Sequence, residues 1–198
     1  MPISKPYGSV LAALFLSVAW NADAADESWI DRELLERGEI VVEVPRNRPA
    51  QRVQVKVAAL IEAKPAEIWE VLTACELAPE YVPNVVSCRL LETLDGGRAE
   101  LFVQVVKPAF FLPRFEHVFR LDYEPFERVR VHRVSGPIAY MEGTWELLPR
   151  PDGKTLLLYD LEVDPGMPVP RFWLRATMRR DIPRIVEAVR DLSEAAAG

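Results

Sequence analysis

The sequence predicts a single α+β domain in which a curved antiparallel sheet of six or seven strands packs against a long C-terminal helix. Apolar and polar residues alternate through a series of segments between residues 52 and 163, as in strands with one buried face. Short turns at residues 95–97 (DGG) and 151–153 (PDG) favour an antiparallel meander. A helical pattern then runs from about residue 168 to residue 196, and no other predicted element is long enough to cover the sheet.

The elements before the meander are a short helix, a short strand, one long strand and a second helix. The first helix is expected within Asp26–Arg37, where apolar residues recur at helical spacing, and the short strand at Ile40–Val44. The alternation in Arg52–Glu62 predicts the first long strand. The second helix is expected at Pro65–Leu72, because proline fits the first turn of a helix.

Six further strand candidates and the terminal helix complete the chain. The strand candidates are Val85–Leu94, Arg98–Val106, Arg114–Tyr123, Arg128–Ser135, Met141–Leu148 and Thr155–Val163. Pro183 lies inside the terminal helix, where proline removes a backbone donor. We therefore expect this helix to kink or break near Arg180–Pro183.

The first residues have the layout of a secretory signal peptide. Lys5 precedes an apolar run from Val10 to Ala19, and a small-x-small cleavage site follows at Ala22–Ala24. The run is about half of the roughly 20 residues that cross a bilayer as a helix. Cleavage after Ala24 and export to the periplasm are therefore favoured over an uncleaved membrane anchor. The predicted division of the chain is a signal peptide at 1–24, an N-terminal extension at 25–50 and a domain at 51–198.

Charge and cysteine content restrict the partners and the chemistry. The formal net charge is −6, which argues against general nucleic-acid binding because that requires a basic surface. The two cysteines, Cys75 and Cys88, either form a disulfide in an oxidising compartment or remain separate buried thiols. With two histidines and no CxxC pair, the sequence predicts no metal site. Nothing in the composition indicates an oligomeric state.

Motifs for nucleophilic or nucleotide-dependent catalysis are absent from the sequence. It contains no G-x-S-x-G elbow, no phosphate-binding loop and no dinucleotide-binding fingerprint. We therefore expect no catalytic nucleophile and no cofactor.

Two stretches carry a longer pattern, IEAKPAEIWEVLTACELAPEYVPNVVSCRLLE (Ile61–Glu92) and GTWELLPRPDGKTLLLYDLEVDPGMPVP (Gly143–Pro170). Together they resemble the START-like (SRPBCC) superfamily, in particular its polyketide cyclases and coenzyme Q binding proteins. The resemblance implies a helix-grip fold with an apolar cavity between the curved sheet and the C-terminal helix. It does not choose between carriers and enzymes, because one fold supports many functions.

One face of each strand would line such a cavity, although the same pattern also builds an ordinary filled core. His117 is the most informative candidate, because an imidazole buried between Phe115 and Phe119 requires a partner. It either contacts a ligand, or hydrogen-bonds Tyr159 or Glu142, or lies near the rim. The candidates for ligand contact are Leu101, Val103, Val105, Phe115, His117, Phe119, Val131, Trp145, Tyr159, Phe172, Trp173 and Ala176.

Apolar residues also occupy places where polar residues are expected. Phe110, Phe111 and Leu112 lie in a predicted turn, which indicates a lid over the cavity, a membrane contact or a loop packed on Trp173. Arginines flank the aromatic residues of the terminal helix. This arrangement fits either transient contact with anionic lipid headgroups or a solvated helix face.

The sequence therefore predicts an exported carrier for a hydrophobic or aromatic small molecule, such as a lipid, a quinone or a polyketide-like compound. The first alternative is an aromatic polyketide cyclase or dehydratase in which His117, Tyr159 and Glu142 transfer protons. The second alternative is a cell-envelope interaction module whose cavity is filled.

Overall fold

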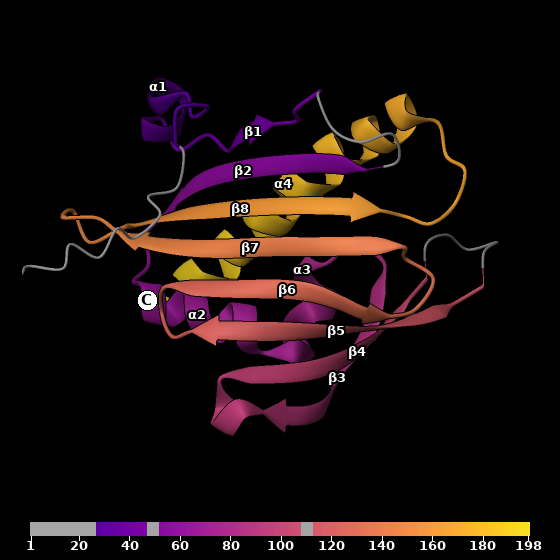
Figure 1. Cartoon of the computed structure of the whole chain (residues 1–198). Coiled ribbons are helices and arrows are strands. Elements are labelled where there is room, and N and C mark those ends of the chain that lie inside the picture. The colour runs from indigo at the N-terminus through magenta and orange to yellow at the C-terminus, as the bar shows by residue number, and fades with distance from the viewer. Residues whose placement is uncertain (1–26, 47–51, 108–112) are drawn as a thin grey trace, which may run out of the picture.

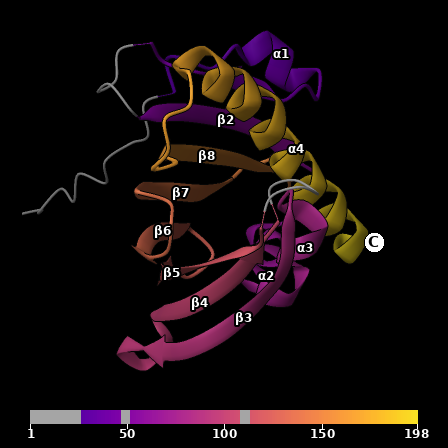
Figure 2. The ribbon, with the colours of Figure 1, turned by 90° about the vertical axis from the view of Figure 1, so that its right-hand side faces the viewer.

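A single antiparallel sheet of eight strands forms the body of the protein, in the order β1-β2-β8-β7-β6-β5-β4-β3 (Figure 1). The computed structural model describes residues 27–46, 52–107 and 113–198. The sheet curves strongly, and the long helix α4 crosses its concave side (Figure 2). The strands are β1 (Val41–Glu43), β2 (Val53–Ile61), β3 (Val85–Leu94), β4 (Ala99–Val106), β5 (Phe115–Glu124), β6 (Arg128–Ser135), β7 (Tyr140–Pro149) and β8 (Thr155–Asp164). The predicted α+β helix-grip architecture is confirmed.

The strand count exceeds the six or seven expected, because β1 joins the sheet. It pairs antiparallel with β2, with Val41 opposite Ala58 and Glu43 opposite Lys56. The N-terminal extension therefore adds an edge strand to the sheet of the main domain.

Short helices connect β2 to β3 and cover one end of the concave face. They are α2 (Pro65–Thr73), the 3-10 turn η1 (Cys75–Leu77) and α3 (Ala78–Tyr81), while α1 (Arg32–Glu36) precedes β1 and the 3-10 turn η2 (Asp95–Gly97) joins β3 to β4. Asp31 caps α1, since its carboxylate accepts hydrogen bonds from the amides of Glu33 and Leu34 at 3.1 and 3.2 Å. At the start of α2, Pro65 occupies the first turn and the Glu67 carboxylate accepts from the Lys64 amide.

Helix α4 (Arg171–Ala197) continues through Pro183, so of the two predicted outcomes, a kink or a break, the break does not occur. Its buried residues are Leu174, Ile182, Ile185, Val186, Val189 and Ser193. From Ile182 onward they follow helical spacing along one face of the helix, and α4 packs against β2 and α2. Apolar packing on both sides of Pro183 holds the helix together despite the missing backbone hydrogen bond.

Two apolar cores lie on opposite faces of the sheet. The larger core fills the concave side, where side chains of β2, β5, β7 and β8 meet α2 and α4. The smaller core covers the convex face at β2 and β8, where Leu35 of α1 and its neighbour Ile30 pack on Ala58, Leu60 and Leu158. In the described part of the chain, no helix combines the length and the apolar character that a transmembrane span requires.

Candidate ligand-binding cavity

A cavity of about 290 Å³ lies between the concave face of the sheet, α2, α3 and α4. This volume is near the lower limit for small-molecule sites, which span about 300–1,000 Å³. The main lining residues are Tyr81, Val85, Phe102, Gln104, Val106, Phe115, His117, Phe119, Leu121, Val129, Val131, Met141, Trp145, Tyr159, Leu161, Met178, Ile182 and Ile185. None of the described residues around the cavity is an Asp, Glu, Lys or Arg. The cavity therefore suits an uncharged, largely apolar molecule.

Aromatic rings form much of the cavity wall. The rings of Trp145 and Tyr159, on adjacent strands β7 and β8, stack with their centroids 3.6 Å apart. Phe102 and Phe119 pair across β4 and β5 with centroids 5.7 Å apart. These flat surfaces give the wall a shape that matches planar ligands.

The cavity reaches the surface at the end of the sheet where β4, β6 and β8 terminate. Pro83, which precedes β3, is exposed, while Phe115, Ile138 and Met178 are half-buried. The deeper wall, including Phe119 and Trp145, is buried. A ligand would therefore enter past the start of β5 and the N-terminal half of α4.

His117 and Gln104 form the main polar contact in the wall. The Nε2 atom of His117 lies 3.0 Å from the Oε1 atom of Gln104, which is directly opposite on β4. Burial lowers the pKa of His117. The imidazole is therefore neutral at neutral pH. Its partner is neither Tyr159 nor Glu142, the two structural alternatives that the sequence offered.

The tyrosines of the cavity also remain uncharged. Burial raises the pKa of Tyr81 to about 12 and likewise raises the pKa of Tyr159. Both phenols stay protonated at neutral pH, so they can donate hydrogen bonds but do not act as bases.

Cys75 and Cys88 are joined by a disulfide, with their Cα atoms 5.4 Å apart. The bond ties the turn η1 to strand β3, and both residues lie in the cavity wall. It therefore fixes one side of the cavity. Among the described residues no group of His, Cys, Asp and Glu could hold a metal ion.

The structure brings six of the twelve predicted contact residues together at the cavity. These are Phe115, His117, Phe119, Val131, Trp145 and Tyr159. Predicted residues of α4 do not reach it, because Phe172, Trp173 and Ala176 lie on the exposed side of the helix. Phe110, Phe111 and Leu112, predicted as a lid or membrane contact, lie outside the described residues.

Strand β4 presents the opposite face from the one predicted. Leu101, Val103 and Val105 point away from the cavity, and Phe102, Gln104 and Val106 line it. The cross-strand register decides this, since directly opposed residues share a face of the sheet. The opposed pairs are Phe102 with Phe119, Gln104 with His117, and Val106 with Phe115.

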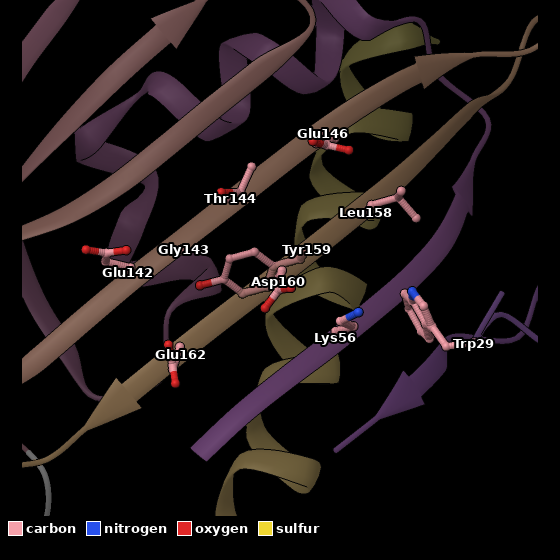
Figure 3. Close-up of a pocket in the computed structure, with 10 residues that line it drawn as sticks. All are labelled: Trp29, Lys56, Glu142, Gly143, Thr144, Glu146, Leu158, Tyr159, Asp160 and Glu162. Carbon is pink, nitrogen blue, oxygen red and sulfur yellow. The ribbon is translucent and has the colours of Figure 1, made fainter. Parts of the chain in front are cut away.

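A second depression of about 350 Å³ lies on the convex face of β7 and β8 (Figure 3). Its carboxylates are already engaged: Glu146 pairs with Arg128 at 2.9 Å, and Asp160 accepts from the Gln54 amide at 2.7 Å. Trp29 forms its outer edge. Because charged residues line this groove, whereas apolar and aromatic residues line the cavity beside α4, the cavity is the better candidate for the site of a hydrophobic ligand.

Comparison with known proteins agrees with this geometry. Residues 61–190 match the family model described as polyketide cyclase/dehydrase and lipid transport. The chain belongs to this polyketide cyclase/dehydrase and lipid transport family. The match extends from the end of β2 into α4 and so includes the strands and helices that enclose the cavity.

Solved structures of START-like proteins share the fold of this family member. A STAR-related lipid transfer protein from Xanthomonas axonopodis is 19% identical with a TM-score of 0.67, over 78% of this chain and 93% of that one. The Zhui aromatase/cyclase from Streptomyces sp. R1128 is 16% identical with a TM-score of 0.57, over 74% and 93%. A START superfamily protein from Mycobacterium smegmatis is 18% identical with a TM-score of 0.63, over 72% and 98%. No curated protein sequence matches the chain.

Proposed function

We propose that the protein is a carrier that holds an uncharged hydrophobic or aromatic molecule in the cavity between the sheet and α4. The observation that carries this proposal is an aromatic, charge-free wall around an interior of about 290 Å³. A lipid, a quinone or a polyketide-like compound has the required apolar character. The printed names of the structural relatives, one a lipid transfer protein and one an aromatase/cyclase, support the same ligand classes.

Extraction of the purified protein with organic solvent, followed by mass spectrometry, tests this proposal. We expect a hydrophobic compound to copurify in a fixed ratio with the wild-type chain. Val131→Trp places an indole in the cavity and should remove the compound. The matched control His132→Trp, whose side chain lies on the opposite face of β6, should retain it. Equal recovery from both variants would contradict the proposal.

Acid–base catalysis on a polyketide is the second candidate, and the His117–Gln104 pair favours it. The pair introduces polar groups into an otherwise apolar wall. A neutral imidazole can accept a proton from a bound substrate. If the protein is a cyclase, it should convert a synthetic poly-β-keto thioester, and His117→Phe should abolish turnover while the folded state is retained. Binding without conversion would leave the carrier function.

Export of the protein is the next part of the proposal. The signal-like segment at 1–24 supports it, and the Cys75–Cys88 disulfide is of a kind that persists in oxidising compartments such as the periplasm. Fractionation of Gram-negative cells that express the full chain should yield a periplasmic protein whose N-terminus is Ala25. Recovery of the uncleaved chain in the cytoplasm would contradict export.

We also propose that the N-terminal end of α4 contacts an anionic membrane surface while the ligand is exchanged. Phe172 is 76% exposed and Trp173 is 54% exposed, and Met178, further along the same helix, lines the cavity. The pKa of Arg175 is lowered mainly by burial and also by the nearby charges of Arg46, Arg171 and Arg179. Four guanidinium groups therefore lie close together at the N-terminal end of α4. Each arginine near an anionic bilayer contributes about 1 kcal/mol of attraction.

Cosedimentation with vesicles measures this contact. Vesicles that contain phosphatidylglycerol should bind the wild-type protein, and vesicles of phosphatidylcholine alone should bind it more weakly. The double variant Phe172→Ser/Trp173→Ser should lose binding. The control Phe126→Ser removes a phenyl group that is 52% exposed at the opposite end of the sheet, and it should bind normally. Equal binding by the two variants would refute the membrane contact.

A further inference from the structure

His117 and Gln104 are a buried polar pair whose geometry is fixed by the sheet. The two residues are opposite each other in the β4–β5 register, and His117 is 5% and Gln104 9% exposed. The rings of Phe115 and Phe119 flank the imidazole, with centroid separations of 6.3 and 5.5 Å. The imidazole therefore has a defined place in the cavity wall.

The hydrogen bond between the two side chains determines where the imidazole proton lies. The Oε1 atom of Gln104 can only accept, so the Nε2 atom of His117, at 3.0 Å, must donate. A neutral imidazole carries a single ring proton, and burial lowers the pKa of His117 and favours that neutral form. The Nδ1 atom is consequently a bare acceptor.

The Nδ1 atom of His117 is buried and has no hydrogen-bond partner within the described part of the chain. Buried polar atoms in folded proteins almost always have a partner, which is protein, water or ligand. An acceptor without one in the wall of an open cavity is the feature that a ligand with a matching donor would complete.

We infer that the ligand carries a hydroxyl or N–H group that donates to the Nδ1 atom of His117. This inference rests on the proposed carrier function and narrows its ligand class. Phenols, reduced quinones and enols have the required hydroxyl donor, while oxidised quinones, ethers and plain hydrocarbons lack it. An engineered cavity of about 150 Å³ holds benzene. A cavity of about 290 Å³ therefore has room for a two-ring compound.

Three naphthalene probes of similar shape separate the inference from the underlying function. Calorimetric titration at pH 7.5 compares 2-naphthol, which has a donor, with 2-methoxynaphthalene, which has only an acceptor, and with naphthalene. Saturable binding of naphthalene tests the carrier proposal alone. The inference predicts that 2-naphthol binds about tenfold more tightly than the other two, the gain expected from one buried hydrogen bond.

Two variants attribute the preference to the polar pair. His117→Phe keeps an aromatic ring in the wall but removes the acceptor, so all three probes should bind with similar affinity. Gln104 is a positioning residue, because its Oε1 atom holds the imidazole proton on Nε2. Gln104→Leu removes this acceptor, so the proton can also lie on Nδ1 and the preference for 2-naphthol should decrease. Phe119→Leu is the matched control: it alters the shape of the wall and should weaken all three probes alike. These ratios of affinities would not change if the pair merely supported the fold.

NMR of protein labelled with 15N-histidine gives an independent readout. The chain has two histidines, so the variant His132→Gln identifies the signals of His117. We expect Nδ1 to be unprotonated and its signal to shift when 2-naphthol binds. Tighter binding of 2-methoxynaphthalene than of 2-naphthol, or a protonated Nδ1, would overturn the inference. His117 would then be the hydrogen-bond donor and the ligand the acceptor. Equal affinities of the wild type for the three probes would also overturn it, while leaving the carrier function intact.

Discussion

The disulfide between Cys75 and Cys88 should contribute a large part of the stability of the fold. The two residues are separated by 13 positions in the sequence. Loop-closure entropy for a loop of this size predicts a stabilisation of about 3 kcal/mol, because the bond restricts the unfolded chain. With a urea dependence of about 2 kcal/mol per molar, loss of the bond should lower the unfolding midpoint by about 1.5 M.

Urea titrations followed by tryptophan fluorescence measure this effect. Cys75→Ala, Cys88→Ala and the double variant should show the same loss in the presence of a reductant, because each change removes the same bond. Reduced wild-type protein should behave like the three variants. A midpoint that is unchanged by reduction, or single variants whose effects add in the double variant, would refute the assignment of the stabilisation to the disulfide.

Three further predictions concern individual residues. As the pH falls below about 6.5, His117 binds a proton in the unfolded state, whereas in the folded state burial delays protonation to lower pH. The wild type should therefore lose more stability between pH 7.5 and pH 5 than His117→Phe does. Parallel pH profiles of thermal unfolding for the two proteins would refute this. Gly136 has a φ of +115°, and an added Cβ would lie 2.7 Å from the Cβ of His117. Gly136→Ala should therefore lower the free energy of unfolding, measured in urea, by more than about 2 kcal/mol. Gly153→Ala should lower it by about 1 kcal/mol, because the added Cβ there meets open space. Similar losses for both variants would contradict the steric argument. The buried Thr155 hydroxyl donates to the Ala63 carbonyl at 2.7 Å. Thr155→Val should therefore destabilise the folded protein by about 1–2 kcal/mol. An unchanged free energy of unfolding would show that this hydrogen bond is not stabilising.

The residues that face the cavity could be predicted from the sequence where one of the two alternating sets of residues in a strand is mostly polar. In β5 the residues between Phe115, His117 and Phe119 are Glu116 and Val118, and the aromatic run identified the inner face. In β4 both sets of alternating residues are largely apolar, and Gln104 is the one polar residue between Leu101 and Val106. The choice of Leu101, Val103 and Val105 as the inner residues leaves Gln104 on the other face, whereas its pairing with His117 places it in the cavity wall. Only the register supplies that information.

Helix α4 illustrates a second limit of sequence reasoning. Aromatic residues at its start indicated ligand contact, yet Phe172 and Trp173 are exposed. The residues that reach the cavity are Met178, Ile182 and Ile185, spaced four and three apart. This helical spacing was visible in the sequence, but the rotation of the helix against the sheet is set by tertiary packing. The partner of His117 was likewise hidden, because Gln104 belongs to another strand.

Calorimetric titration of naphthalene into the wild type, Val131→Trp and His132→Trp is the sharpest test of whether the cavity beside α4 binds a hydrophobic ligand. We expect saturable binding at one site for the wild type and for His132→Trp, and loss of that binding for Val131→Trp, whose indole would occupy the cavity. Unchanged affinity in Val131→Trp, or no saturable binding by the wild type, would show that the space between the sheet and α4 does not hold a hydrophobic ligand.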